Sequence, residues 1–350
     1  MQMRQRSAEP SRRQFLQLLG AGAMGLAVPE EVLRAAPTFG PKPLRGVFPI
    51  ALTPFTENDQ LDLEALAEEV KFIDRGRVQG FVWPQLASEW STLTERERLD
   101  GMDVIASTGK PLRPAIVLGV QGPDVTTAIR YAKHAETLGA DAIISLPPSE
   151  KSGPQAVLEY YQEVGKATTL PLFVQAVGKM SVELILNIYR TVPTMRHVKD
   201  EAGDPLTHIG PLREKSGDQI KVFSGAHGRK LLEEMPLGFS GTMPATSFAD
   251  LYAATWDLWH EGKKEEAAAM HARTLKAIDE MLRYGSEGMK YVLCLRGVFK
   301  TCGVRTARGQ GFSAAGKLAT GSSKARTRLD EAGKKALRDM LDSLKPYLRA

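Results

Sequence analysis

The sequence predicts an α/β fold, a (β/α)₈ TIM barrel that carries a C-terminal helical extension. From Leu44 onward, eight short β-branched or apolar runs alternate with amphipathic stretches of helical spacing. After Ser247 the strand pattern stops and only helical patterns follow. Of the 350 residues, 43% are hydrophobic and 25% are charged, which excludes a collagen-like or a wholly disordered chain.

Each of the eight runs is expected to form one strand of the barrel. The stretches between them have helical spacing, as in the apolar stripe of Leu66, Val70 and Ile73, and they tend to end in Gly or Pro. Eight strand–helix units favour a closed barrel, with a doubly wound open sheet as the structural alternative. The expected strands are residues 47–53, 80–84, 113–120, 142–146, 170–177, 195–199, 220–223 and 239–243.

The region after the barrel is expected to be helical. Helices are predicted over residues 248–262, 265–285, 286–303 and 330–348, with a Gly-, Ala- and Ser-rich loop over 303–323. Cys294 and Cys302 are the only cysteines, so a disulfide framework and a Cys-based zinc site are excluded. On one helix the two would lie about 12 Å apart, too far to bridge, and we expect them to be unpaired.

The first 36 residues have the character of an export signal. A stretch rich in Arg precedes an apolar stretch over residues 15–28 and a small-residue site at Arg34-Ala35-Ala36. Ser11-Arg12-Arg13-Gln14-Phe15-Leu16 is similar to the twin-arginine motif, which predicts a periplasmic or otherwise exported protein. The alternative is a disordered basic tail beside a short amphipathic helix. The expected division is therefore a signal at 1–36, a barrel core at 44–247, and the eighth helix with the extension at 248–350.

Several partner classes do not fit the sequence. The net charge of +5 is spread along the chain, whereas a nucleic-acid binder concentrates its basic charge. No apolar run reaches the roughly 18 residues that span a bilayer, so we expect no stable membrane insertion. The sequence has no Gly-rich phosphate loop. His134, His208, His260 and His271 have no partners at metal-ligand spacing, so no metal is expected.

Lys199 is the most unusual residue at the predicted strand ends. In a (β/α)₈ barrel the active site lies at the C-terminal ends of the strands, and Lys199 ends the sixth. Because a strand alternates its faces, His197 and Lys199 point the same way. If that way is inward, desolvation lowers the lysine pKa, and the neutral amine can attack a carbonyl to form a Schiff base. The alternative is a rim lysine paired with Asp200, Glu201 or Asp204.

Several segments match one known family in their order along the chain. The segments are Gly46-Val47-Phe48-Pro49 with Leu52-Thr53-Pro54-Phe55, Glu89 to Thr94, Val198-Lys199-Asp200-Glu201-Ala202-Gly203-Asp204, Gly238 to Thr242, and Gly288-Met289-Lys290. Together they resemble the dihydrodipicolinate synthase / N-acetylneuraminate lyase family over about residues 44–303.

The resemblance implies a function and a set of site residues. Members of that family are (β/α)₈ barrels, commonly homotetramers, that bind a 2-oxo acid such as pyruvate as a Schiff base on a lysine, here Lys199. It implies a class I lyase or aldolase acting on a 2-oxo acid or aldehyde, without a cofactor, in a homo-oligomer (tetramer or dimer). The residues expected to bind the substrate are Thr53, Gln85, Ser88, Glu89, Ser149, Gln175 and Thr242.

The sequence departs from the family pattern around the lysine. The usual hydroxyl pair of the second strand is replaced by Leu86 and Ala87, and the fourth strand lacks its tyrosine pair. Dihydrodipicolinate synthase itself is therefore not expected. A general acid–base group is needed in place of the tyrosine, and His227 is the leading candidate, with His197, Ser149, Glu150 and Asp200 as further options.

The aromatic residues near these departures have two interpretations. Tyr160 and Tyr161 fall in a helical pattern and are expected to be packing residues. Trp83 and Trp90 either pack between barrel and helix or face the mouth, where they would favour an apolar substrate.

Two other functions stay open. One is an exported barrel that binds a metabolite without turnover. The other is a hydratase or dehydratase on the same barrel that does not use Lys199 covalently.

Overall fold

The sheet is the centre of the structure. The computed structural model describes residues 41–148, 152–305 and 328–350. Within these residues the strands form one eight-stranded sheet in which every pair is parallel. The strands are β1 (Gly46–Val47), β2 (Gly80–Trp83), β3 (Ala115–Gly119), β4 (Ala142–Ser145), β5 (Leu172–Val177), β6 (Met195–Glu201), β7 (Lys221–Ser224) and β8 (Gly241–Thr242).

The sheet curls until its first two strands meet. The strand order is β1-β8-β7-β6-β5-β4-β3-β2, so β1 pairs with β8 at one end of the series. At the other end, Ile50 forms a parallel bridge with Val82 of β2, and Ala51 N donates to Val82 O at 2.9 Å. The predicted barrel is thereby confirmed over the doubly wound open sheet.

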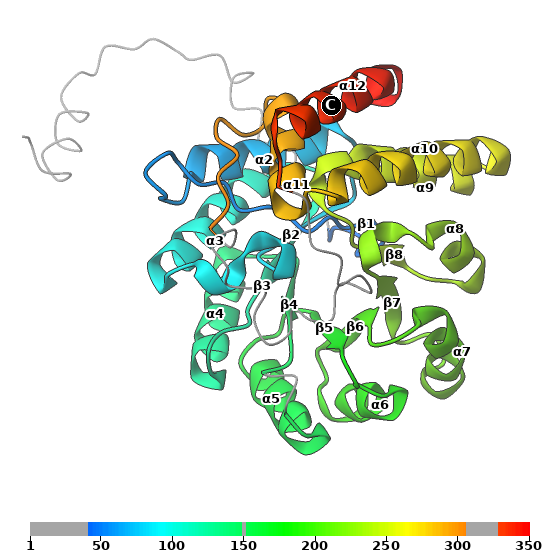
Figure 1. Ribbon diagram of the computed structural model, residues 1–350. Helices are drawn as coiled ribbons and strands as arrows, with labels where there is room; N and C mark the ends of the chain where they lie inside the picture. The colour runs from blue at the N-terminus through cyan, green and yellow to red at the C-terminus, as the bar shows by residue number, and fades with distance from the viewer. Residues whose placement is uncertain (1–40, 149–151, 306–327) are drawn as a thin grey trace, which may run out of the picture. The chain divides into compact units, whose positions relative to one another are not determined.

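Helices alternate with the strands and surround them (Figure 1). Several begin at residues whose side chains cap the first turn: Asp62 accepts from Ala65 N, and Thr94 forms a capping box with Glu97. The helices are α2 (Leu63–Arg75), α3 (Glu95–Gly109), α4 (Val125–Leu138), α5 (Pro154–Lys166), α6 (Val182–Thr191), α7 (Pro205–Ser216), α8 (Leu231–Glu234), α9 (Ala249–His260), α10 (Lys264–Leu282), α11 (Gly285–Leu295) and α12 (Glu331–Leu344).

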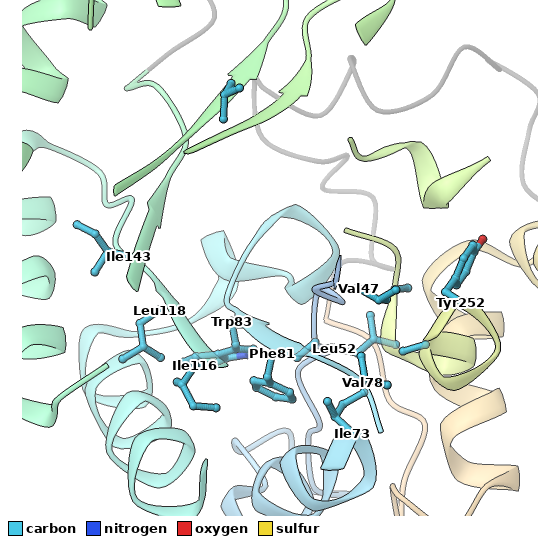
Figure 2. Packing of buried hydrophobic residues seen from close by; sticks show 14 of the residues in the cluster. Val47, Leu52, Ile73, Val78, Phe81, Trp83, Ile116, Leu118, Ile143 and Tyr252 are labelled. Atoms are coloured by element: carbon cyan, nitrogen blue, oxygen red, sulfur yellow. The ribbon is translucent and has the colours of Figure 1, made fainter. Parts of the chain in front are cut away.

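Strand alternation separates two apolar cores. One side of each strand packs against the helices, as Phe81, Ile116 and Ile143 do (Figure 2). The other side fills the barrel with a second cluster that includes Phe173 and Phe223. Because the period of a strand is two residues, each position along a strand belongs to one core or the other. This rule decides which strand-end side chains can reach the barrel mouth.

The C-terminal extension corrects two predictions. Helix α11 ends at Leu295 instead of continuing to residue 303, because Gly297 has a φ of +72° and the chain turns back. The Cα atoms of Cys294 and Cys302 therefore lie 6.3 Å apart and the two residues form a disulfide. The expectation that they are unpaired was wrong because it placed both on one continuous helix.

The last helix closes over this region. Helix α12 contacts α10 and α11 and buries Leu337, Leu341 and Leu344. The predicted signal at 1–36 and most of the predicted loop at 303–323 lie outside the described residues. Among the helices that the structure describes, none combines the length and the apolar character that a bilayer crossing requires.

Candidate active site

Lys199 lies inside the barrel, near the C-terminal end of β6. The strand continues two residues beyond the predicted end, so His197, Lys199 and Glu201 share the inner face while Val198 packs in the outer core. The Lys199 side chain is 5% exposed, and its Nζ lies 3.0 Å from Glu201 Oε2. The lysine is therefore a buried member of an ion pair.

Glu201 was expected only as one possible partner of a rim lysine and was not among the predicted site residues. Its Oε2 accepts from Gln175 Nε2 at 2.7 Å as well as pairing with Lys199, and its Oε1 accepts from Ala226 N at 3.2 Å. Burial alone would raise the pKa of Glu201, but Lys199 and these donors hold the pKa below its ordinary value. The signal was present in the sequence, since residue 201 is two positions beyond Lys199 on the same strand face.

The backbone of the next strand makes room for this carboxylate. Gly225 follows β7, and a Cβ atom there would lie 1.9 Å from Glu201 Oε1. Gln175 of β5 is in register with Lys199 and is fully buried. Three neighbouring strand ends therefore fix the position of one carboxylate beside one amine.

The floor beneath Lys199 is aromatic. His197 stacks on Phe173 with 4.2 Å between ring centroids, and Phe223 lies close by. Burial, together with the charges of Lys221 and Arg196, lowers the pKa of His197 to about 3. His197 is thus a neutral residue of the barrel core, and Lys199 lies above an apolar plug.

Apolar side chains line part of the mouth above the lysine. Leu86, Leu146 and Val177 form a small buried cluster, with Trp90 packed against it. By strand alternation Leu146 and Val177 belong to the inner face. Trp83 does not face the mouth but packs between barrel and helix, fully buried in the outer core (Figure 2). Its ring lies so close to Gly101 of α3 that a Cβ atom there would clash with it.

Gln85 reaches the inner face at the end of β2. Gln121 Nε2 donates to Pro84 O at 2.8 Å, and Gln85 Nε2 donates to Gln121 Oε1 at 2.9 Å. Because a carbonyl oxygen can only accept, this chain fixes the orientation of both amides. Gln85 Oε1 and Gln175 Oε1 are left as buried acceptors without a hydrogen-bond partner among the described residues.

The hydroxyls of Thr53 and Ser88 hold the loop after β2. Thr53 Oγ1 donates to Ser88 O and accepts from Trp83 Nε1 at 3.0 Å. Ser88 Oγ donates to Ala51 O and accepts from Gln85 N at 2.9 Å. Both side chains lie at the mouth end of the barrel, with their hydrogen-bonding capacity directed to the protein.

Glu89 faces the C-terminal extension. Its φ of +56° turns the chain between two short 3₁₀ turns, and its carboxylate pairs with Lys290 of α11. Each side chain of this pair is 1% exposed. The carboxylate of Glu89 thus joins the loop after β2 to α11.

Thr242 lies on the outer face of β8. Its Oγ1 accepts from Ser224 Oγ at 3.1 Å, and Ser224 also donates to Glu234. Burial raises the pKa of Glu234 to about 7. By alternation, Thr242 belongs with the helical layer, because its neighbour Met243 belongs to the inner cluster.

The two remaining predicted residues follow strands. His227 lies in the turn after β7 with a φ of +55°, is half-buried, and accepts from the Tyr252 hydroxyl through its carbonyl oxygen. It is therefore on the mouth end of the strand next to β6. Ser149, with Glu150, lies outside the described residues.

Tyr160 and Tyr161 pack behind the barrel, as predicted. Both are on α5, where Tyr160 hydrogen-bonds Ser145 Oγ at 2.7 Å and Tyr161 donates to Ser145 O at 2.8 Å. Burial raises the pKa of Tyr160 to about 12. Since β4 turns Ser145 toward the outer core, neither hydroxyl comes to the amine from this face.

A cavity of about 340 Å³ lies at the opposite end of the barrel. Its lining includes Leu44, Ile220 and Ser240, each of which precedes a strand. Active sites in this fold form at the other end, and Lys199 is there, so we assign the site by its chemistry. Within the described ranges, the structure has no group of three or more His, Cys, Asp or Glu that could hold a metal ion.

Comparison with known proteins places the chain among relatives of one architecture. The chain is 25% identical over 192 residues to a 4-hydroxy-tetrahydrodipicolinate synthase of Methanosarcina mazei, covering 53% of this chain and 65% of that protein. It is 25% identical over 253 residues to a protein of Escherichia coli named as a probable 2-dehydro-3-deoxy-D-pentonate aldolase, covering 67% of this chain and 81% of that one. The match to the first relative therefore spans slightly less than two thirds of its length.

Solved structures show the same fold. The dihydrodipicolinate synthase of Rhodopseudomonas palustris superposes with a TM-score of 0.73 at 20% identity, covering 87% of this chain and 99% of that one. A prophage protein of E. coli K12, solved in complex with pyruvate, gives a TM-score of 0.72 at 20% identity and covers 86% and 99%. The model of the dihydrodipicolinate synthetase family matches residues 43–308, most of the chain. The chain is a member of the dihydrodipicolinate synthetase family.

Proposed function

We propose that this protein is a class I lyase or aldolase that binds a 2-oxo acid of the pyruvate type as a Schiff base on Lys199. The observation that carries this proposal is the position of Lys199: buried on the inner face at the mouth end of β6, with its Nζ 3.0 Å from Glu201 Oε2. A buried amine beside a carboxylate can lose its proton within the site and attack a carbonyl. The protonated imine then draws electrons from the neighbouring carbon while a C–C bond forms or breaks.

Borohydride trapping tests the covalent step. The protein is incubated separately with three compounds, each together with sodium borohydride, and its intact mass is measured. The compounds are pyruvate, a longer aliphatic 2-oxo acid and an aryl-substituted 2-oxo acid. We expect one reduced adduct, located by peptide mapping on Lys199. Lys199→Ala should form none, whereas Lys221→Ala, which removes an exposed lysine at the start of the neighbouring strand β7, should form it normally.

A folded wild-type protein that forms no adduct with any acid would contradict the proposal. In that case equilibrium binding without turnover would favour the non-catalytic barrel. Turnover without an adduct would favour a hydratase or dehydratase that does not use the lysine covalently.

The mouth supports a substrate with an apolar substituent. Leu86, Leu146 and Val177, with Trp90, provide an apolar wall where a small charged ligand would find few partners. We expect 4-phenyl-2-oxobutanoate to be trapped faster than pyruvate at equal concentration. Leu86→Thr should reduce that preference, and a preference for pyruvate in both proteins would contradict the apolar wall.

Export is proposed from the twin-arginine motif at residues 11–16, and the Cys294–Cys302 disulfide supports it because such bonds persist in oxidising compartments. Arg12→Lys/Arg13→Lys should leave the protein in the cytoplasmic fraction. Equal export of this variant would contradict the assignment.

A homo-oligomer, a tetramer or a dimer, is proposed from the family membership. Light scattering of the purified protein checks it, and a monomeric mass would contradict it.

A further inference from the structure

We propose that Glu201 is the catalytic residue that takes the proton from Lys199 and returns it to the water that leaves during imine formation. The inference rests on the proposed function, since it concerns the same lysine. It differs from the sequence-based prediction, which gave the role of the proton relay to His227.

The Glu201 carboxylate lies within hydrogen-bond distance of the Lys199 amine nitrogen. Glu201 Oε2 lies 3.0 Å from Lys199 Nζ, within the reach that proton transfer requires. Both groups are on the inner face of one strand, two residues apart, so the strand itself fixes their spacing.

The carboxylate is held but not sealed. Gln175 Nε2 and Ala226 N donate to it from β5 and from the turn after β7, and Gly225 leaves the space that it occupies. The Glu201 side chain is 19% exposed, against 5% for Lys199. A substrate entering from the mouth can therefore meet the carboxylate and the amine together.

The proton moves in a closed cycle. The Lys199 ammonium gives a proton to Glu201, which leaves a neutral amine and a carboxylic acid. The amine lone pair attacks the carbonyl carbon, and a proton passes from nitrogen to the carbonyl oxygen to give a carbinolamine. Its C–O bond then breaks as Glu201 returns its proton to the leaving oxygen, which departs as water. The products are a protonated imine and the Glu201 carboxylate, so atoms and charge balance.

The neighbouring acidic and imidazole groups are less suited to this step. Asp200 is on the outer face, where it accepts from Ala202 N at 3.0 Å and pairs with His208 at 2.8 Å. His197 is part of the aromatic floor. Asp204 caps α7 and pairs with Lys230 at the rim. Among these groups, Glu201 is the one that contacts the amine itself.

Single-turnover trapping tests the role. The rate of adduct formation is measured with pyruvate in the full-length protein and in Glu201→Gln. We expect the variant to form the Lys199 adduct at least about 100-fold more slowly than wild type, which is the usual effect of losing a general acid–base group. Asp204→Asn, which alters the same segment at the rim, should form it at the wild-type rate.

An electrostatic role alone predicts the opposite result. Removing a carboxylate from beside the ammonium favours the neutral amine, so Glu201→Gln would then be trapped as fast as wild type or faster. That outcome would overturn the proton role while leaving the lysine chemistry intact. If His227→Gln slows trapping as expected for Glu201→Gln, and Glu201→Gln does not, the relay is His227. No adduct in the wild type would overturn the proposed function and this role together.

Two further variants keep the test decisive if Glu201→Gln folds poorly. Gly225→Ala leaves every charge in place but displaces the carboxylate, and we expect slower trapping from it as well. Glu201→Ala should regain part of its rate when formate is added, because a small carboxylate can occupy the vacated space. A merely structural role for Glu201 predicts no response to formate.

Discussion

Two buried Lys–Glu pairs lie in the described part of the chain, and they differ in what surrounds them. The Lys199–Glu201 pair is on one strand at the barrel mouth, with side-chain exposures of 5% and 19%. The Lys290–Glu89 pair joins α11 to the loop after β2, and each of its side chains is 1% exposed. Lys290 also donates to Gly303 O at 2.7 Å and lies 4.4 Å from the centroid of the Phe55 ring.

The difference supports the proposed reactive role of the Lys199 pair and a structural role for the Lys290 pair. Burial lowers the pKa of Lys290, but its cation is enclosed by protein partners on several sides. Lys199, by contrast, has a partner carboxylate whose side chain is 19% exposed. Burial of a lysine is therefore a weak indicator of chemistry by itself, and the direction from which a substrate can approach decides the role.

The largest effect should come from breaking the enclosed pair. Lys290→Met leaves the Glu89 carboxylate in a buried site, and we expect the free energy of unfolding to fall by about 3–5 kcal/mol. Lys199→Met leaves Glu201 with two other donors and partial exposure, so its loss should be smaller, about 1–3 kcal/mol. Urea unfolding of the two variants and the wild type makes the comparison. Equal losses would remove the distinction between the pairs.

The Cys294–Cys302 disulfide should stabilise the region around Lys290 without affecting the chemistry of Lys199. It closes a loop with a sequence separation of eight residues next to Gly303, the acceptor of Lys290. Cys294→Ser/Cys302→Ser should lower the free energy of unfolding by about 2–3 kcal/mol and leave the rate of trapping at Lys199 unchanged. Wild-type protein under reducing conditions is the control and should unfold at the same urea concentration as the variant.

Acid should reduce the stability that His197, beneath Lys199, contributes to the folded protein. His197 has a folded pKa of about 3, below the value near 6.5 of an unfolded histidine. As pH falls through 6.5, the unfolded chain binds a proton that the folded chain does not, so the contribution of His197 to the free energy of unfolding declines by about 2 kcal/mol from pH 7 to pH 5. His197→Gln removes this contribution. The difference between the urea midpoints of wild type and His197→Gln should therefore change between pH 7 and pH 5, and a constant difference would contradict the low pKa of His197.

A rise in pH from 7 to 8 should destabilise the protein through Glu69, whose carboxyl is near enough to Lys290 to feel its charge. Glu69, which accepts from Leu52 N and Thr246 Oγ1, has its pKa raised to about 8 by burial. Because this pKa is raised on folding, the stabilising contribution of Glu69 is fully present below the pKa of the unfolded carboxyl, 4.5, and is lost as pH rises through the folded pKa of about 8. From pH 7 to pH 8 the loss is about 1 kcal/mol. Glu69→Gln should flatten that slope, and an unchanged slope would assign it to other groups.

Much of the fold was predictable because it depends on local pattern. The eight strand–helix units appear as period-two and period-3.6 hydrophobicity, and each predicted strand overlaps an observed one. The turn at Gly297 was not predictable in this way, because a glycine within an apolar helical pattern can lie inside a helix as well as at its end. The error about Cys294 and Cys302 followed from it.

The site was predictable in part. Lys199 follows from strand position, and the face that it shares with His197 follows from alternation, but which face points into the barrel did not. The partners of the polar residues did not follow: Glu89 pairs with Lys290, which is 201 positions further along the chain, and Ser88 donates to Ala51 O. Thr242 lies on the outer face because it alternates with Met243, which belongs to the inner cluster.

The sequence by itself determined the barrel, the lysine at its sixth strand and the fact that the lysine shares a strand face with His197, because hydrophobic period and strand alternation are properties of neighbouring residues. Only the tertiary structure decided which carboxylate meets which lysine, which hydroxyls hold loops, and that the two cysteines join. Those outcomes depend on where distant segments meet when the barrel closes, and a contact between residues far apart in the chain leaves no periodic trace in one sequence.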